Sequence, residues 1–168
     1  ALRGTGLAQA DNRMQQLNLS ARLDDRQRAN VDLKVAGIQA GETALGTLQA
    51  VGNGDMRRQA LTLALNGPQL KLDLGLDGQL DKGDWRGRLA AGRVQAGGQD
   101  WQLQAPAKLQ RLASGQLAFG AHCWRSGQAR PCGAAQRFAP DPRLRYHLTR
   151  LPLDRLAPWL HIRSASVR

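Results

Sequence analysis

One pattern constrains the fold more than any other: in two runs between residues 61 and 80, leucine occupies nearly every second position. The leucines are Leu61, Leu63 and Leu65 and, after a Gly67-Pro68 turn signal, Leu70, Leu72, Leu74, Leu76 and Leu80. Such an alternation puts every leucine on one face of a strand and the intervening, mostly polar residues on the other. The two runs therefore predict neighbouring antiparallel strands with one apolar face and one polar face.

The same alternation recurs along most of the chain. It predicts strands over residues 2–8, 17–23, 29–35, 45–51, 61–66, 70–80, 85–94, 101–105, 108–112, 116–124 and 143–151. Glycine, asparagine and aspartate residues between these runs are typical of tight turns, among them a hairpin turn around residues 25–27. We therefore expect a meander of about ten strands.

A single segment breaks the alternation. Leu153, Leu156 and Leu160 follow helical spacing, Asp154 can cap the start of a helix, and Pro158 limits its length. One short helix cannot cover a large sheet as the helices of an α/β fold do. The predicted fold class is all-β: a long antiparallel sheet with one short helix near the C-terminus. Its leucines must be covered by the sheet curling onto itself, by a second sheet, or by something other than protein.

Length and composition fit one domain or a slice of a longer protein. The 168 residues include 19 glycines and 7 prolines, which are spread along the chain, and no run approaches the roughly 20 apolar residues of a membrane span. Neither a signal peptide nor an initial methionine is present, and the last residues end in the middle of a pattern. We therefore expect residues 1–168 to be a single segment of a longer, repetitive protein.

The positive charge is concentrated in the last third of the chain. Residues 1–110 carry a net charge of +3, residues 111–168 carry +8, and 20 of the 24 cations are arginine. Arginine-rich surfaces attract phosphate groups, whether these belong to nucleic acid or to lipid headgroups. A solvated surface without a partner explains the same composition equally well, so charge alone does not select a function.

The two cysteines, Cys123 and Cys132, lie on either side of a turn expected at residues 126–128. On facing strands they would come within disulfide distance, and closing this loop would stabilise the fold by about 2–3 kcal/mol. A zinc site with His122 is the alternative, but His122 and Cys123 would point to opposite faces of a strand, and a fourth ligand is missing. We favour the disulfide, which indicates an oxidising compartment such as the periplasm.

No group of residues indicates catalysis. The histidines (His122, His147 and His161) lack ligand spacing, and no pair of carboxylates is placed for acid/base chemistry. The Gly4-Thr5-Gly6 segment does not continue as a dinucleotide-binding motif, and no P-loop is present. We expect no enzyme activity, no metal and no cofactor. Four tryptophans without a repeat spacing are interpreted as packing residues rather than base-stacking residues: Trp85, Trp101, Trp124 and Trp159.

Four segments carry a resemblance to a known family. Leu76–Leu80 and Trp85–Leu89 share a Leu/Trp-x-Gly-x-Leu pattern, a Cys-Trp…Cys element spans residues 122–132, and a Leu-Pro-Leu…Trp-Leu segment spans residues 151–160. On these residues the chain resembles the TamB family, AsmA-like subunits of the translocation and assembly module that are related to bridge-like lipid transfer proteins. The pattern spans most of the chain, and the last two elements are its most specific parts.

This resemblance implies a β-taco, a long sheet curled into an open gutter with an apolar interior. It also implies a segment of a conduit that carries phospholipid acyl chains from the inner to the outer membrane and supports the assembly of outer-membrane proteins such as autotransporters. The implied location is the periplasm of a Gram-negative bacterium, with the full-length protein anchored in the inner membrane. The outer-membrane partner of the module would be bound by regions outside residues 1–168.

The predicted lining of the lipid groove is aliphatic rather than aromatic, which suits acyl chains without selecting one. It comprises Leu17, Leu19, Leu23, Val31, Leu33, Val35, Leu61, Leu63, Leu65, Leu70, Leu72, Leu74, Leu76, Leu117 and Phe119. The helix leucines (Leu153, Leu156 and Leu160) are expected to plug this groove or to fill a seam where the sheet bends.

Two other functions fit parts of the sequence. A chaperone-like scaffold would accept a strand of a client outer-membrane protein at an exposed sheet edge. A nucleic-acid binder would account for the basic charge, but the expected disulfide and the lack of a recognised motif argue against nucleic acid as a partner. A solvent-open leucine surface would favour the lipid conduit, whereas a closed sandwich would exclude it for these residues.

Overall fold

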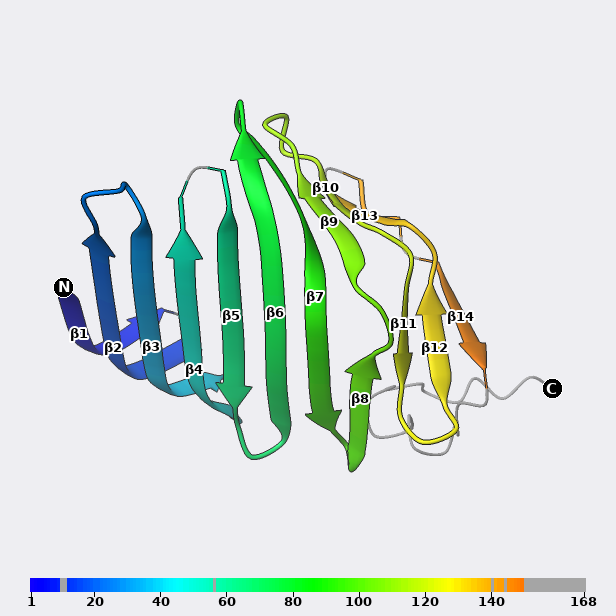
Figure 1. Cartoon of the computed structure of the whole chain (residues 1–168). Coiled ribbons are helices and arrows are strands. Elements are labelled where there is room, and N and C mark those ends of the chain that lie inside the picture. Colours follow the sequence, from blue (N-terminus) through cyan, green and yellow to red (C-terminus); the bar gives the residue numbers. More distant parts are fainter. Residues whose placement is uncertain (10–11, 56, 140, 144, 150–168) are drawn as a thin grey trace.

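The computed structural model describes residues 1–9, 12–55, 57–139, 141–143 and 145–149. This part of the chain forms 14 strands in one antiparallel sheet (Figure 1). It contains no helix, so the all-β prediction is confirmed for the described residues. The helix expected over Leu153, Leu156 and Leu160 lies outside them.

The strands fall into two length classes. The long-strand region contains seven strands of 8 to 13 residues: β1 (Leu2–Gln9), β2 (Asn12–Leu23), β3 (Ala29–Ala40), β4 (Thr43–Gly54), β5 (Gln59–Asn66), β6 (Leu70–Asp81) and β7 (Asp84–Ala96). The short-strand region contains seven strands of 3 to 5 residues: β8 (Gln99–Leu103), β9 (Ala107–Arg111), β10 (Leu117–Phe119), β11 (His122–Arg125), β12 (Arg130–Gly133), β13 (Gln136–Ala139) and β14 (Tyr146–Thr149).

The sheet branches at β7. Strands β1 to β8 form a meander in which each strand pairs with the next. The first half of β7, Trp85–Leu89, also pairs with β9, whereas its last residues, Arg93–Ala96, pair with β8. One branch continues from β9 through β10 to β13, and the other from β8 through β11 and β12 to β14 (Figure 1). The main path thus runs from β1 to β14 without closing on itself.

The hairpin predicted from the leucine alternation is present as β5 and β6. Leu61 faces Leu76, Leu63 faces Leu74, and Leu65 faces Leu72. Residues that face each other across an antiparallel pair share one side of the sheet. We call the side that carries these residues the leucine face, and the opposite side, which carries Thr62, Lys71 and Asp73, the polar face.

A row of irregular glycine positions crosses the first strands. Gly6, Gly37 and Gly46 have left-handed φ angles of +64°, +64° and +84°, and the pairing register between β3 and β4 shifts on either side of Ile38. Glycine adopts these angles without the steric penalty of other residues, and bulges bend a strand. In Figure 1 the lower ends of β1–β4 accordingly turn away from the viewer and pass behind the sheet.

Two features of the short-strand region differ from the sequence-based expectation. The strand predicted over residues 116–124 is divided into β10 and β11, because the Gly120 amide still bonds to Lys108 of β9 while the Cys123 carbonyl accepts a bond from Gln104, next to β8. The chain therefore crosses from one branch to the other at this point. Strands β12 and β13 were not among the runs of alternation, because their sequences, Arg-Pro-Cys-Gly and Gln-Arg-Phe-Ala, are too short to show one.

Very little of this sheet forms a conventional core. The buried hydrophobic residues in the described part of the chain are Val35, Leu89, Ala107 and Ala129, and no large side chain there is fully buried. A domain that packed two layers face to face would bury a much larger set of leucines. The sheet is a single layer over most of its area.

Candidate functional site

The strand pairing joins the apolar residues of successive strands into continuous rows on the leucine face. One row runs from β2 to β8 through Leu17, Val35, Leu48, Leu65, Leu72, Val94 and Trp101. A second runs from β2 to β9 through Ala21, Val31, Gly52, Leu61, Leu76, Leu89 and Ala107. Each row crosses seven strands, so the apolar surface is continuous and not a set of isolated patches.

Most side chains on this face are shielded by their neighbours but stay partly accessible, and in the two rows Val35, Leu89 and Ala107 are buried. The leucines of β5 and β6 are half-buried, and near the edge Leu23 is 71% exposed and Val31 is 37% exposed. Within the described residues, no helix or second sheet is available to lie over these rows. Exposed apolar patches of this extent are uncommon in soluble monomers and mark binding surfaces.

All fifteen residues of the predicted lining lie on the leucine face. Leu117 and Phe119 reach it through the β9 branch, where Phe119 faces Leu109 and Leu109 faces Gly87 of β7. Their role in lipid binding stays a prediction. Other residues of the rows were not singled out from the sequence, although they lie within predicted strands: Leu48, Ala50, Leu89 and Val94. These residues could be assigned to the leucine face only once the strand register was known.

Tryptophan rings fill the gaps that glycines leave in this face. The Trp85 indole lies over Gly78 and Gly87, where an added Cβ atom would come within 2.6 Å of the ring. Its Nε1 group donates a hydrogen bond of 2.9 Å to the Gln59 Oε1 atom. The Trp124 ring covers Gly92 in the same way. These contacts support the packing role expected for these two tryptophans.

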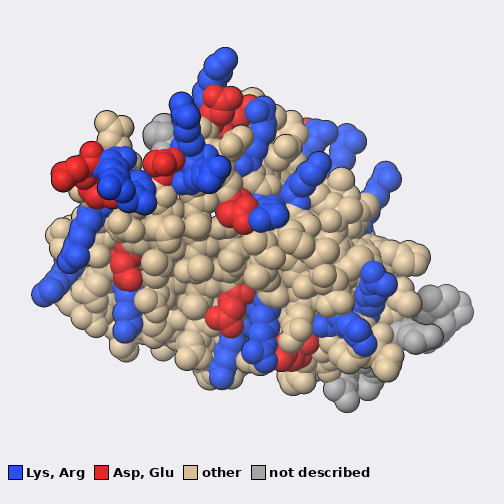
Figure 2. All heavy atoms as spheres, viewed as in Figure 1, with Lys and Arg blue, Asp and Glu red and all other residues tan. Residues whose placement is uncertain are grey.

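The polar face carries paired charges. Arg88 binds both carboxylate oxygens of Asp77 (2.9 and 3.0 Å), and Arg93 binds Asp100 through two bonds of 2.9 and 2.6 Å. The side-chain hydrogen bond from Arg93 lowers the pKa of the Asp100 carboxyl below its ordinary value. These pairs are exposed and contribute little to stability. Figure 2 looks onto this face and shows cations and acids along its upper and lower margins, with few in the middle.

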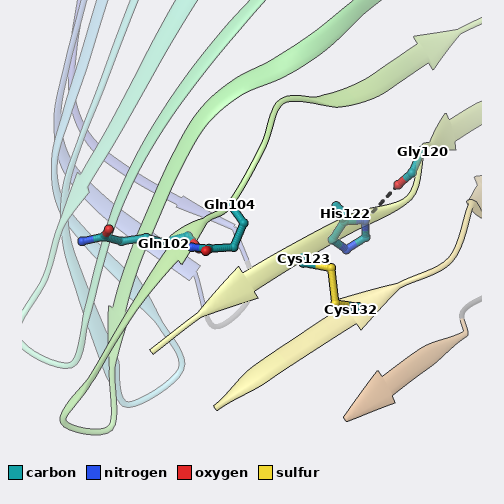
Figure 3. The surroundings of a disulfide bond; sticks show 6 residues. All are labelled: Gln102, Gln104, Gly120, His122, Cys123 and Cys132. Carbon is teal, nitrogen blue, oxygen red and sulfur yellow. Dashed lines mark hydrogen bonds between the residues drawn. A yellow bond between two sulfur atoms is a disulfide. The ribbon is translucent and has the colours of Figure 1, made fainter. Parts of the chain in front are cut away.

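A disulfide joins β11 and β12, as predicted. Cys123 faces Cys132 across the strand pair, with their Cα atoms 4.1 Å apart (Figure 3). Both sulfur atoms are used in this bond, so they cannot ligate zinc. Among the described residues, no three His, Cys, Asp or Glu side chains form a cluster suited to a metal.

His122 forms the centre of a small core between the two branches. It is 5% exposed, and its Nδ1–H group donates a 2.9 Å bond to the Gly120 carbonyl (Figure 3). Its ring packs against Phe119 at a centroid distance of 4.2 Å. Tyr146 meets it edge-on at 5.7 Å. The ring fits because Gly133, directly opposite, has no side chain. His122 is therefore a packing residue and not a surface residue.

Of the other two histidines, the structure describes one. His147 is exposed on β14, and His161 lies outside the described residues.

In the part of the chain that the structure describes, no helix has the length and apolar character needed to cross a membrane.

Comparison with known proteins places the chain in a family. The model of the TamB N-terminal domain matches residues 1–165, which is nearly the whole chain. No curated protein and no solved structure was found to match. The match covers both the long-strand and the short-strand region, including the disulfide. The chain therefore belongs to the TamB N-terminal domain family.

Proposed function

We propose that this chain is a segment of a periplasmic gutter whose leucine face carries the acyl chains of phospholipids between the inner and outer membranes of a Gram-negative bacterium. The observation that carries this proposal is the continuous set of apolar rows across β2–β9, most of whose side chains stay partly accessible. Membership of the TamB family supports a part in the translocation and assembly module. Through the module, the conduit would support the assembly of outer-membrane proteins such as autotransporters.

The bend of β1–β4 supports a gutter rather than a flat sheet. Figure 2 shows that the polar face is turned toward the viewer, and in Figure 1 the lower ends of these strands pass behind the sheet. The bend is therefore toward the leucine face, and it would make that face concave. The glycine row at Gly6, Gly37 and Gly46 permits the bend.

Aliphatic side chains suit a conduit that carries lipids without selecting among acyl chains. Leucine and valine supply apolar surface, and a hydrocarbon chain that replaces water on them gains roughly 25 cal/mol for each Å² buried. Nothing in this chemistry requires a cofactor, a metal or a catalytic group, and we propose none. Partners in the outer membrane would contact parts of the full-length, membrane-anchored protein beyond residues 1–168.

Native mass spectrometry of the purified protein tests this proposal. We expect phospholipid to co-purify with the protein, because detergent-free solution leaves the leucine face exposed to water. Leu63→Asp should abolish the bound lipid, since it puts a charge in the middle of the leucine face. Thr62→Asp, next to it on the polar face of β5, is the matched control and should retain the lipid. A lipid-free wild-type protein would contradict the proposal.

One observation favours a second candidate, strand addition by a client protein. In the described part of the chain β1 pairs only with β2, no described strand lies along its other edge, and Leu2 there is 62% exposed. Thr5→Pro should block pairing at this edge while leaving lipid binding intact. Crosslinking of β1 to an outer-membrane protein precursor, lost in this variant but not in Leu63→Asp, would support the scaffold instead of the conduit.

A further inference from the structure

The hairpin turn between β4 and β5 separates two depressions on opposite faces of the sheet. One lies on the leucine face and has a volume of about 570 Å³. The other lies on the polar face and has a volume of about 990 Å³. The two share five lining residues at the turn: Asn53, Gly54, Asp55, Gln59 and Ala60. A single elongated ligand bent over this turn would reach both.

The depression on the leucine face is apolar and is hollowed by a missing side chain. Its walls include Leu23, Val31 and Leu61. Between the last two lies Gly52, where an added Cβ atom would meet Leu61 and Val31 only at ordinary distances of 3.8 and 3.9 Å. Gly52 also lacks a left-handed φ angle, so a larger residue is sterically possible there. The hollow suits the end of an acyl chain.

The depression on the polar face has an excess of positive charge. Its cations are Arg28, Arg57, Arg58, Arg86, Arg88 and Lys108, and its acids are Asp24, Asp55 and Asp77. The described residues form four ion pairs, and these occupy Arg28, Arg86 and Arg88 but not Arg57, Arg58 or Lys108. The Arg57 and Arg58 side chains at the β4–β5 turn therefore form none of these ion pairs, and their charges are available for an anion.

The backbone of this turn is fixed by its own aspartate. The Asp55 Oδ1 atom accepts hydrogen bonds from the Arg57 and Arg58 amides at 2.7 and 2.8 Å. This turn, the β2–β3 turn and the β6–β7 turn lie at the upper edge of Figure 1, and all three carry cations. The lower turns at residues 41–42, 67–69 and 97–98 carry none. Of these turns, those at the upper edge thus combine cations with the leucine face.

We propose that the β4–β5 turn is a phospholipid headgroup site, in which the phosphate binds Arg57 and Arg58 on the rim while an acyl chain enters the hollow at Gly52. This inference rests on the proposed lipid-carrying function and adds to it a fixed position and a chemical requirement for phosphate. Lipids would then travel with their headgroups along the upper edge. A bidentate guanidinium contact is the chemistry that recognises a phosphodiester there.

Calorimetric titration with two short-chain lipids tests the site. Dioctanoyl phosphatidylglycerol and dioctanoylglycerol have the same acyl chains, but only the first has a phosphate. Below their micelle-forming concentrations, we expect the wild-type protein to bind the phospholipid about tenfold more tightly. Arg57→Gln with Arg58→Gln should remove this preference and leave dioctanoylglycerol binding unchanged. Gly52→Leu should weaken the binding of both lipids by filling the hollow.

Matched control variants separate the effect of the position from the effects of net charge and of side-chain size. Arg3→Gln with Lys71→Gln removes the same charge from strand positions away from the rim and should retain the preference. Gly75→Leu adds the same bulk on the polar face, where an added Cβ atom meets Ala91 at 3.7 Å, and should retain binding of both lipids. Inorganic phosphate and a single-stranded oligonucleotide should each bind more weakly than the phospholipid.

The possible failures are distinguishable. If the rim variant keeps the phospholipid preference, or if inorganic phosphate or the oligonucleotide binds as tightly as the phospholipid, the headgroup site is wrong while diacylglycerol binding still supports the conduit. If the wild-type protein binds neither lipid, the proposed function itself fails and the headgroup site fails with it.

Discussion

The long-strand region and the short-strand region belong to one sheet but treat their apolar side chains differently. In the long-strand region only Val35 and Leu89 are buried hydrophobic residues among those described, although most of the leucine face lies in this region. The short-strand region is smaller, yet it buries Ala107 and Ala129 together with two polar side chains. One region keeps its apolar face open, and the other closes around a core of its own.

Under the proposed function, this difference separates the part that binds lipid from the part that stabilises the sheet. The short strands are held by a disulfide and by the ring of His122, which packs between the two branches. The long strands are held mainly by backbone hydrogen bonds and by cross-strand leucine pairs. If the leucine face must stay accessible to lipid, as proposed, it cannot also be buried in a core, and a compact region at one end of the sheet would supply stability in its place.

The largest contrast is expected when the same charge is introduced into each region. Ala107 is 1% exposed, and Ala107→Asp should lower the free energy of unfolding by about 3–5 kcal/mol because it buries an unpaired carboxylate. Leu63→Asp should cost only about 1–2 kcal/mol, since its side chain is half-buried and the new charge reaches water. Urea denaturation measures both. Equal losses would mean that the leucine face at Leu63 is packed as tightly as the buried position of Ala107.

Removal of the disulfide should act on the short-strand region alone. The bond closes a loop with a sequence separation of 9, and Cys123→Ser with Cys132→Ser should cost about 2–3 kcal/mol. Hydrogen exchange should accelerate in β11, β12 and β14 while β3–β6 keep their protection. Exchange that accelerates uniformly over all strands would show instead that the two regions unfold as one cooperative unit.

The bend of the long-strand region should depend on Gly46. An added Cβ atom there would collide with the Asn66 carbonyl, and the φ angle of +84° is unfavourable for alanine. Gly46→Ala should therefore destabilise the protein by about 1–3 kcal/mol. Gly75→Ala, which meets only ordinary contacts at Ala91, is the control and should change stability by less than about 1 kcal/mol. Similar values for the two variants would remove the argument that the glycine row shapes the sheet.

The smallest effect is an acid-dependent loosening of two upper turns. Backbone hydrogen bonds from the Arg28 and Arg58 amides lower the pKa values of Asp24 and Asp55, respectively, below 3.8. A carboxyl whose pKa is lowered by folding stabilises the native state above its ordinary pKa, and this contribution is lost as the pH falls through the lowered value. Stability should therefore decline below pH 3.8.

Asp55→Asn provides the control for this acid effect, because the asparagine oxygen still accepts the amide bonds but does not titrate. The decline below pH 3.8 should be shallower in this variant, as measured by thermal unfolding across pH. An unchanged pH profile would show that Asp55 does not hold the turn through its charge.

The sequence was most informative where the leucine alternation is long. The β5–β6 hairpin and the all-β class are confirmed, because a long alternation of period two leaves few alternative structures. The family is also confirmed, and its signal came from the four short segments of resemblance and not from the alternation. The disulfide was also predictable, since two cysteines flanking a turn have few geometric options.

The branch at β7 could not be read from the sequence. It depends on which neighbour each half of Trp85–Val94 pairs with, and that choice is decided by packing between distant segments. The buried position of His122 depends likewise on Gly133, eleven residues away in the sequence and directly opposite on β12. The proposed phosphate-binding role of Arg57 and Arg58 could not be predicted from the sequence, because two arginines in a turn are usually only solvated. Its proximity to the hollow at Gly52 emerges from the fold alone.

The most direct test of the central claim asks which face of β5 touches lipid hydrocarbon. The four native tryptophans would be replaced by phenylalanine, and single indoles introduced by Leu63→Trp on the leucine face or by Thr62→Trp on the polar face. Phospholipids brominated in their acyl chains quench indole fluorescence only at short range. We predict strong quenching in the Leu63→Trp protein and little in the Thr62→Trp protein. Equal quenching of the two, or quenching of the Thr62→Trp protein alone, would contradict an acyl-chain site on the leucine face.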